Sequence, residues 1–585
     1  MDTQRYALLI ALALVSWMML VEWNVFREAH REAAESAVAA QEAAPATAVA
    51  SPGDTPAEAQ DPAPPGGELP SLPAPTSAPA RPNVTAAAEA IAPNDERVRV
   101  ETDSLVVDIA LEGGDIVAVS LPRFLAEIDK PDRPFKLLEQ ASDRSYIAQS
   151  GLIGPNGTDT AEGRPRFSSA SRSLSLGKES KELLVDLVHT TAAGVQITKR
   201  FRFERGSYVV GVEYLVDNRS PAQWQAAMFG QLRRDDRPDP SATGGALGIQ
   251  PFLGFATRTV EEPYIKRSIA DLAEEPYSAQ TSGGWVALVQ HYFISAWIPT
   301  PDHQNRFELL RSDTGNNLGR FTSPSVTLAP GQSATLAARF YAGPKDQYTL
   351  KTISAGLDLT VDYGWLWWIA QPLFALLSFF ATGRLHIFGW ETELGSGTGN
   401  WGAAIILLTL FVKACFFQLS ATSYKSMAKM RVLQPKMLEL RERYGDDRQK
   451  LSQETMDLYR REKVNPLGGC LPILIQMPVF LALYWVLLES VELRQAPFLA
   501  WIDDLSVMDP YFVLPILMGA SMYYQQKLNP PPPDPMQAKI FQFMPIIFTV
   551  FFLFFPAGLV LYWLVNNVLS IAQQWVITRQ IERGA

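Results

Sequence analysis

Cysteine and histidine are scarce in this chain of 585 residues, which contains two cysteines and five histidines. Cys415 and Cys470 both lie in or beside apolar segments, which excludes a disulfide framework and favours packing roles. No histidine follows His386, so the apolar C-terminal part lacks the usual metal ligand and the usual base of a serine hydrolase. A Gly-rich phosphate loop followed by Lys-Ser or Lys-Thr is also missing. The sequence therefore predicts no metal, no cofactor and no catalytic residue.

Negative charge predominates, with a formal net charge of −10, but it is unevenly distributed. The acidic excess lies largely before residue 360. The short stretch from Tyr424 to Lys463 instead carries eleven Lys and Arg against seven Asp and Glu. Loops between membrane spans that are rich in Lys and Arg remain on the cytoplasmic side, so this stretch is predicted to face the cytoplasm.

The first apolar run covers residues 6–21. It ends in Trp17, Met18, Met19 and Leu20 rather than in the small residues of a cleavage site, which predicts an uncleaved signal anchor with a cytoplasmic N-terminus. Residues 27–96 are rich in Ala, Pro, Glu and Ser, and no aromatic residue occurs between Phe26 and Phe124. Such a composition cannot bury a core, so this segment is predicted to be a disordered tether.

Residues 97–345 have the pattern of an all-β domain. Alternation is clearest in Tyr208, Val210, Val212, Tyr214 and Val216, which follow an Arg205-Gly206 turn signal and an earlier alternating run. This pattern predicts a hairpin, and the other short apolar runs separated by turn residues predict a sandwich of roughly 250 residues. Because one membrane crossing precedes it, the domain is expected on the periplasmic side.

The composition changes abruptly after Asp362. Five segments are predicted to span the membrane as an α-helical bundle: residues 401–420, 470–491, 511–526, 540–555 and 558–577. A further apolar run, residues 362–380, would reverse the orientation of the basic loop if it spanned, so we interpret it as an interfacial amphipathic helix. The prediction is a multi-pass inner-membrane protein with six spans, both termini in the cytoplasm and a large periplasmic all-β domain.

The cytoplasmic loop, residues 424–463, is predicted to be a helical hairpin with a turn near Gly445 and a kink at Pro435. Its apolar residues recur at intervals of three or four. Two interpretations remain open, a solvated structural hairpin and a Met-rich surface that receives ribosomes, targeting factors or an emerging apolar chain. The residues proposed for this surface are Met427, Met430, Leu433 and Tyr444.

Lys413 lies inside an otherwise apolar predicted span, where a charged residue costs at least about 2.5 to 3.5 kcal/mol. A hydrated cavity with polar partners would compensate this cost, and we favour it over a lysine that snorkels to the interface. Polar residues at four-residue spacing form stripes on neighbouring spans. The predicted hydrophilic groove consists of Thr409, Lys413, Gln476, Tyr562, Asn566 and Ser570, flanked by Met477, Phe480 and Tyr484 as apolar contacts for a client chain.

Six motifs make a family resemblance recognisable. They are LDLTVDYGWLW from Leu357, SMAKM from Ser426, LQPK from Leu433, KVNPLGGC from Lys463, QMP from Gln476 and SVELRQAPF from Ser490. They closely resemble the Oxa/Alb/YidC family of membrane protein insertases in its Gram-negative form. The resemblance implies a periplasmic supersandwich similar to galactose mutarotase. It also implies a groove open to cytoplasm and lipid that carries a basic residue. That residue is Lys413 here, where many members have arginine, and the following groove position that is often proline is Gln418.

The resemblance implies an ATP-independent insertase and chaperone that works alone or with the Sec translocon. The implied partners are nascent membrane proteins, the Sec translocon with its accessory subunits, the ribosome and signal recognition machinery, and membrane lipids. Two rival functions fit the sequence less well. A small-molecule transporter would show repeated halves with broken helices, and no such repeat is seen. A membrane-anchored sugar-binding or sugar-modifying protein would leave Lys413 and the hairpin unexplained.

Overall fold

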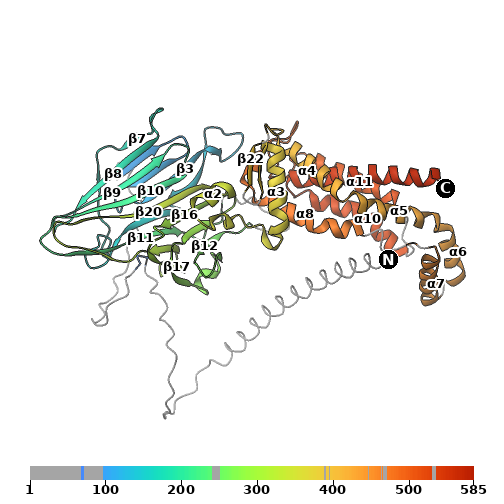
Figure 1. Cartoon of the computed structure of the whole chain (residues 1–585), viewed down its shortest axis with the longest axis horizontal. Coiled ribbons are helices and arrows are strands. Elements are labelled where there is room, and N and C mark those ends of the chain that lie inside the picture. The colour runs from blue at the N-terminus through green and yellow to red at the C-terminus, as the bar shows by residue number, and fades with distance from the viewer. Residues whose placement is uncertain are drawn as a thin grey trace, which may run out of the picture. The chain divides into compact units, whose positions relative to one another are not determined.

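The structure is a computed structural model that describes residues 68–70, 96–239, 251–387, 390–393, 395–445, 447–462, 464, 471–529 and 535–584. The predicted signal anchor at residues 6–21, most of the predicted tether at residues 27–96, and Cys470 lie outside the described residues. The sequence prediction of a large all-β domain followed by a helical region is confirmed (Figure 1).

The first sheet of the β-domain is largely antiparallel and has the order β14-β17-β18-β11-β5-β4-β3-β2-β1-β7, with β19 paired to β11. Its strands are β1 (Arg97–Glu101), β2 (Val106–Ala110), β3 (Ile116–Leu125), β4 (Pro134–Gln140), β5 (Ser145–Ile153), β7 (Ser173–Ser175), β11 (Trp224–Arg234), β14 (Tyr277–Ser282), β17 (Gln304–Arg311), β18 (Asn317–Thr322) and β19 (Val326–Leu328).

The second sheet has the order β13-β12-β15-β16-β20-β10-β9-β8-β6. Its strands are β6 (Ser168–Ser169), β8 (Glu182–Thr190), β9 (Val195–Glu204), β10 (Val209–Asn218), β12 (Gly254–Arg258), β13 (Ile265–Ser268), β15 (Trp285–Val289), β16 (Phe293–Pro299) and β20 (Ser333–Pro344). Side chains from both sheets share one buried core, so the two sheets pack face to face as a sandwich.

The hairpin predicted from alternation is formed by β9 and β10. Val212 pairs with Phe201 and Val216 with Ile197, and all four side chains are buried. The turn contains Gly206 at a φ of 74°, a left-handed conformation that glycine adopts without steric cost. Alternate residues of both strands point into the core, which is the two-residue period on which the prediction rested.

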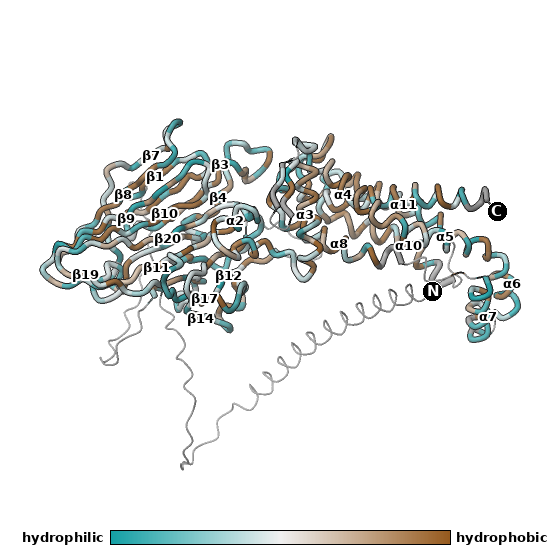
Figure 2. Tube along the Cα trace, viewed as in Figure 1, coloured by the Kyte–Doolittle hydropathy of each residue, from teal (hydrophilic) through white to brown (hydrophobic). Residues whose placement is uncertain are grey.

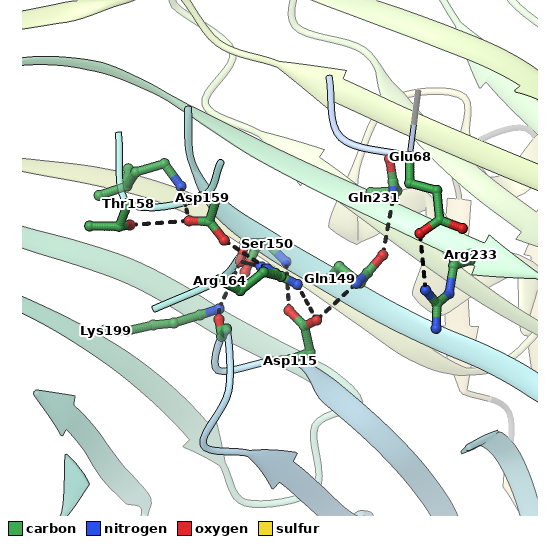
Figure 3. Close-up of polar contacts among 12 residues, drawn as sticks. Glu68, Asp115, Gln149, Ser150, Thr158, Asp159, Arg164, Lys199, Gln231 and Arg233 are labelled. Carbon is green, nitrogen blue, oxygen red and sulfur yellow. Dashed lines mark hydrogen bonds and ion pairs between the residues drawn. The ribbon is translucent and has the colours of Figure 1, made fainter. Parts of the chain in front are cut away.

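A closed polar cluster lies inside the sandwich (Figure 3). The Arg164 guanidinium pairs with Asp115 and donates from Nε to Asp159 at 2.8 Å. Lys199 is fully buried, and its Nζ donates to the carbonyls of Gly113 at 2.9 Å and Ser150 at 3.1 Å. Burial lowers the pKa of Lys199 to about 7, because desolvation disfavours the ammonium form more than the nearby Asp115 favours it.

Short elements connect the β-domain to the helical region: α2 (Gln347–Ile353), η4 (Leu357–Thr360), η5 (Gly364–Leu366) and α3 (Trp367–Thr382), followed by the hairpin β21 (Arg384–Ile387) and β22 (Trp390–Glu393). The helices after it are α4 (Trp401–Cys415), α5 (Phe417–Val432), α6 (Gln434–Tyr444), α7 (Arg448–Arg461), α8 (Leu471–Glu489), α9 (Val513–Leu528), α10 (Pro535–Phe552) and α11 (Ala557–Gly584), with η7 (Val491–Leu493) after α8. Figure 2 shows hydrophobic colouring along α3, α4 and α8, and mostly hydrophilic colouring on α6 and α7.

The segment expected as one span, residues 401–420, is broken. Helix α4 ends at Cys415 and α5 begins at Phe417, with an angle of 68° between them. The break contains neither proline nor glycine, and it falls where the apolar run gives way to Gln418 and Ser420. Lys413 therefore lies in the last turn of α4 rather than in mid-helix.

Among the described residues, one continuous helix is long and apolar enough to cross a membrane, Gly364–Thr382, and the bent pair of α4 and α5 passes the same test together. Gly364–Thr382 coincides with the helix that we interpreted as interfacial, and Trp365, Trp367 and Trp368 at its start are exposed. The count of six spans stays a prediction.

The predicted first helix of the cytoplasmic hairpin is divided into α5 and α6 at Leu433. Pro435 stands in the first turn of α6, where a backbone N–H would have no intrahelical partner and its absence costs little. The kink expected at Pro435 is therefore found as a helix boundary. Helices α6 and α7 contact each other, and Lys436 Nζ lies 2.7 Å from Glu462 Oε1. Leu440 and Leu458 line the same hollow between these two helices.

The β-domain also contacts the end of α8 and the segment that follows it, and the residues involved fall within one compact unit. Lys345 Nζ lies 2.6 Å from Glu489 Oε2, with both side chains nearly buried. His291 Nε2 lies 2.9 Å from the Leu488 carbonyl oxygen. The Arg494 guanidinium lies over the Phe293 ring, 5.5 Å from its centroid. The sequence analysis did not predict these contacts, because their partners lie far apart in the sequence.

The burial of Lys199 predicts a pH dependence of β-domain stability. Its pKa is about 7 when folded and about 10.4 when unfolded, so between these values the unfolded chain binds more protons. The free energy of unfolding should therefore rise as pH increases from 7 towards 10, and this contribution should be lost below pH 7. Thermal unfolding of the intact chain, followed by the circular dichroism of its strands, should show this rise in the wild type.

Lys199→Met should remove this rise, whereas Lys181→Met, at an exposed position, should retain it. An unchanged pH slope in Lys199→Met would show that the lysine does not titrate in this way.

Candidate functional site

Lys413 has a polar partner on another helix. Its Nζ donates a hydrogen bond of 2.7 Å to the Ser570 hydroxyl, which lies 157 residues later in the sequence, on α11. The Ser570 hydroxyl in turn donates to the Asn566 carbonyl of its own helix at 2.7 Å. Helices α4 and α11 are in contact, and Lys413 is half-buried. The cation is therefore held in a chain of hydrogen bonds.

The predicted polar stripe on α11 follows one face of the helix. Tyr562, Asn566 and Ser570 recur every four residues and are 1%, 7% and 4% exposed. On α4, Thr409 lies one turn before Lys413, is also buried, and donates to the Ile405 carbonyl at 2.7 Å. The Thr409 hydroxyl thus hydrogen-bonds within its own helix, whereas the Ser570 hydroxyl forms a hydrogen bond between α4 and α11.

Sequence reasoning missed further polar side chains on and around α11. Asn567 Nδ2 donates to the Ser521 hydroxyl on α9 at 3.2 Å, and Gln573 Nε2 donates to the Phe417 carbonyl at 3.2 Å. The Tyr424 hydroxyl also contacts Ser570. The pairs Asn566-Asn567 and Gln573-Gln574 were the available signal, because adjacent amides place polar groups on two faces of a helix.

The predicted residues on α8 have different surroundings. Gln476 is half-buried, and its place in the site stays a prediction. Met477 is 40% exposed. Phe480 packs edge-on against Trp563, with 4.6 Å between ring centroids. The ring centroids of Tyr484 and Phe555 are 6.1 Å apart. Of the three apolar residues proposed to contact a client, Met477 is the most open, while the other two pack partly against aromatic neighbours.

The predicted hairpin residues mostly face the protein. Met427 and Met430 belong to a small apolar cluster with Tyr424 and Ile577 of α11, and Leu433 is buried. Tyr444 is half-buried, with Lys450 Nζ 5.9 Å from its ring centroid. The apolar side chains that this region exposes are instead Val432, Leu438 and Met456.

The two hydroxyls of the site should differ in their effect on stability. Ser570→Ala removes the partner of a charged donor and should lower the free energy of unfolding of the helical region by about 1 to 2 kcal/mol. Thr409→Val keeps the side-chain shape, and the Ile405 carbonyl retains its helical N–H, so the loss should be about 0.5 kcal/mol or less. Thermal unfolding in detergent compares the two, and equal losses would contradict the assigned roles.

Comparison with known proteins places the chain in a family. The family described as 60Kd inner membrane protein matches residues 393–584, and the one described as YidC periplasmic domain matches residues 97–376. Membrane protein insertase YidC of Alcanivorax borkumensis is 54% identical over 84% of this chain and 85% of its own length. The protein of the same name from Cellvibrio japonicus is 52% identical over 100% of this chain and 99% of its own.

A solved structure titled as an active YidC insertase with the first transmembrane domain resolved is matched with a TM-score of 0.36 and 17% identity, over 82% of this chain and 92% of that one. Both halves of the chain match family descriptions, and relatives about half identical in sequence cover its full length. The chain therefore belongs to the YidC family of membrane protein insertases.

Proposed function

We propose that this protein inserts nascent membrane proteins into the bacterial inner membrane and assists their folding, alone or with the Sec translocon. The proposed site is a hydrophilic groove built around Lys413, Ser570 and the polar stripe of α11. The hydrogen bond from Lys413 to Ser570 is the observation that carries this proposal, because it places a cation next to buried hydroxyl and amide groups on an apolar helix pair. Family membership supports the same function.

The proposed mechanism relies on solvation and needs no reaction. A hydrated tail of a client, often acidic, must enter the inner leaflet before it can cross. Polar groups around Lys413 would replace part of the water around the client tail and so lower the free-energy cost of its entry. Apolar partitioning of the client helix into lipid, worth about 25 cal/mol per Å² of buried apolar surface, would then drive lateral release. Exposed Met477 offers the client a transient apolar contact.

Two further surfaces suit the other proposed partners, the ribosome with its targeting machinery and the membrane lipids. The cationic helices α6 and α7 would face the cytoplasm and receive the ribosome, the signal recognition machinery or the emerging client. The exposed Trp365, Trp367 and Trp368 suit the lipid interface, where indole side chains are favoured. In this arrangement both chain termini are cytoplasmic and the β-domain is periplasmic.

Cysteine accessibility tests this topology. In a variant with Cys415 and Cys470 replaced by serine, a cysteine at Asp108 should react with an impermeant maleimide added to spheroplasts. A cysteine at Gly445 should react only after the membrane is opened, because the basic loop is cytoplasmic. Labelling of Gly445→Cys in closed spheroplasts would rule out the six-span arrangement.

Substitutions at Lys413 test the electrostatic role of the groove. Lys413→Arg should leave the insertion rate nearly unchanged, because arginine keeps the positive charge and only replaces the compact ammonium with a guanidinium. Lys413→Ala should slow insertion of a single-span client with an acidic translocated tail, and Lys413→Glu should slow it most. The change in the free-energy barrier to insertion should be about a few kcal/mol or less, since water in the groove screens the charge.

The control is the same client with its acidic tail residues neutralised, measured in the same insertion assay. If Lys413→Ala and Lys413→Glu insert the acidic client at the wild-type rate, the lysine has no electrostatic role in insertion.

A further inference from the structure

A short piece of the predicted tether lies on the β-domain. Residues Glu68, Leu69 and Pro70 are described, and Pro70 is buried. The sequence singles out the same place, because Leu69 and Leu72 are the only two leucines between residues 27 and 96. In a segment dominated by Ala, Pro, Glu and Ser, this is the one point that offers large aliphatic side chains close together.

The Glu68 carboxylate enters a polar site formed by strand β11 and the turn between β17 and β18. Arg233 of β11 places Nη1 3.5 Å from Glu68 Oε2 (Figure 3). Asn316, before β18, donates from Nδ2 to Glu68 Oε1 at 2.8 Å, and the Thr314 hydroxyl donates to the same oxygen. The Arg233 side chain is 7% exposed, so the carboxylate supplies an anion to a nearly buried cation.

Leu69 occupies an adjoining apolar site. It packs against Ile153 of β5 and against Ala227 and Phe229 of β11. These three side chains are buried and form a cluster separate from the main core of the sandwich. Apolar and charged contacts therefore lie side by side, matched to successive residues of one short peptide.

We propose that this surface is a docking slot for Glu68-Leu69-Pro70, and that it clips the tether to the β-domain. The class of ligand is a short peptide with a carboxylate followed directly by leucine. Roughly 25 residues of the same chain separate Pro70 from β1, and a linker of this kind gives an effective concentration in the millimolar range. Weak contacts are therefore enough to fill the slot, and the clip opens and closes.

The clip shortens the run of chain between the predicted signal anchor and the β-domain. Without it, roughly 70 residues join the two, whereas with it about 40 residues do. At 3.3 to 3.6 Å per extended residue, the maximal reach falls from roughly 240 Å to about 140 Å. The slot thus sets how far the anchor can lie from the β-domain.

Hydrogen exchange in the full-length protein in lipid nanodiscs tests this proposal. The amides of Gly315 and Asn316 donate to Ser312 in the turn that binds the Glu68 carboxylate, so they should be protected while the slot is filled. Glu68→Lys and Leu69→Asp should each speed their exchange at least about threefold, while the β-domain strands keep their protection. Val260→Asp, at an exposed position of the β-domain away from the slot, is the control and should leave the protection unchanged.

A synthetic peptide of residues 64–73 tests the slot itself. At millimolar concentration it should restore the protection of Gly315 and Asn316 in the full-length Glu68→Lys variant, whereas the peptide carrying Glu68→Lys should not. Equal exchange of these two amides in the wild type and in Glu68→Lys would overturn the proposal. Equal effects of Leu69→Asp and Val260→Asp, or equal restoration by both peptides, would also overturn it.

Discussion

The packing of the helical region has to accommodate one ammonium group, that of Lys413, at the end of an apolar helix. Lys413 follows a run of apolar residues in the last turn of α4, where a charge without a polar partner is unfavourable. The Ser570 hydroxyl oxygen accepts a hydrogen bond from Lys413 Nζ at 2.7 Å, and the same hydroxyl donates to the Asn566 carbonyl of α11. Because α11 packs against α4, α5 and α9, this requirement helps to set which face of α11 turns towards its neighbours.

Two lysines illustrate two ways to bury a charge. Lys199 is enclosed between the sheets, donates to two carbonyls and lies close to the Asp115–Arg164–Asp159 cluster, so it belongs to a closed polar cluster in which burial disfavours its charged form. Lys413 is only half-buried, and its described hydrogen-bond partner is a neutral hydroxyl. A cation whose described hydrogen-bond partner is neutral keeps attraction for an external anion, which would suit the proposed groove for acidic client segments.

Regular patterns made much of this structure predictable. Alternation located the β9–β10 hairpin, apolar runs located α8 to α11, and four-residue spacing placed Tyr562, Asn566 and Ser570 on one face. The break at Phe416 was not predictable, because no proline or glycine marks it. The contact between Lys345 and Glu489 and the docking of Glu68 on Arg233 were missed because such pairs join distant parts of the chain, where local patterns carry no information.

Crosslinking to a client addresses the central claim, that the surroundings of Lys413 receive a nascent membrane protein. A photoreactive residue at Phe417, which is exposed beside the end of α4, would be compared with one at the similarly exposed Ile546 of α10 while a stalled single-span client is bound. The account predicts strong crosslinks from position 417 that weaken in Lys413→Glu, and weak crosslinks from position 546. Equal crosslinking from both positions, unchanged in Lys413→Glu, would contradict it.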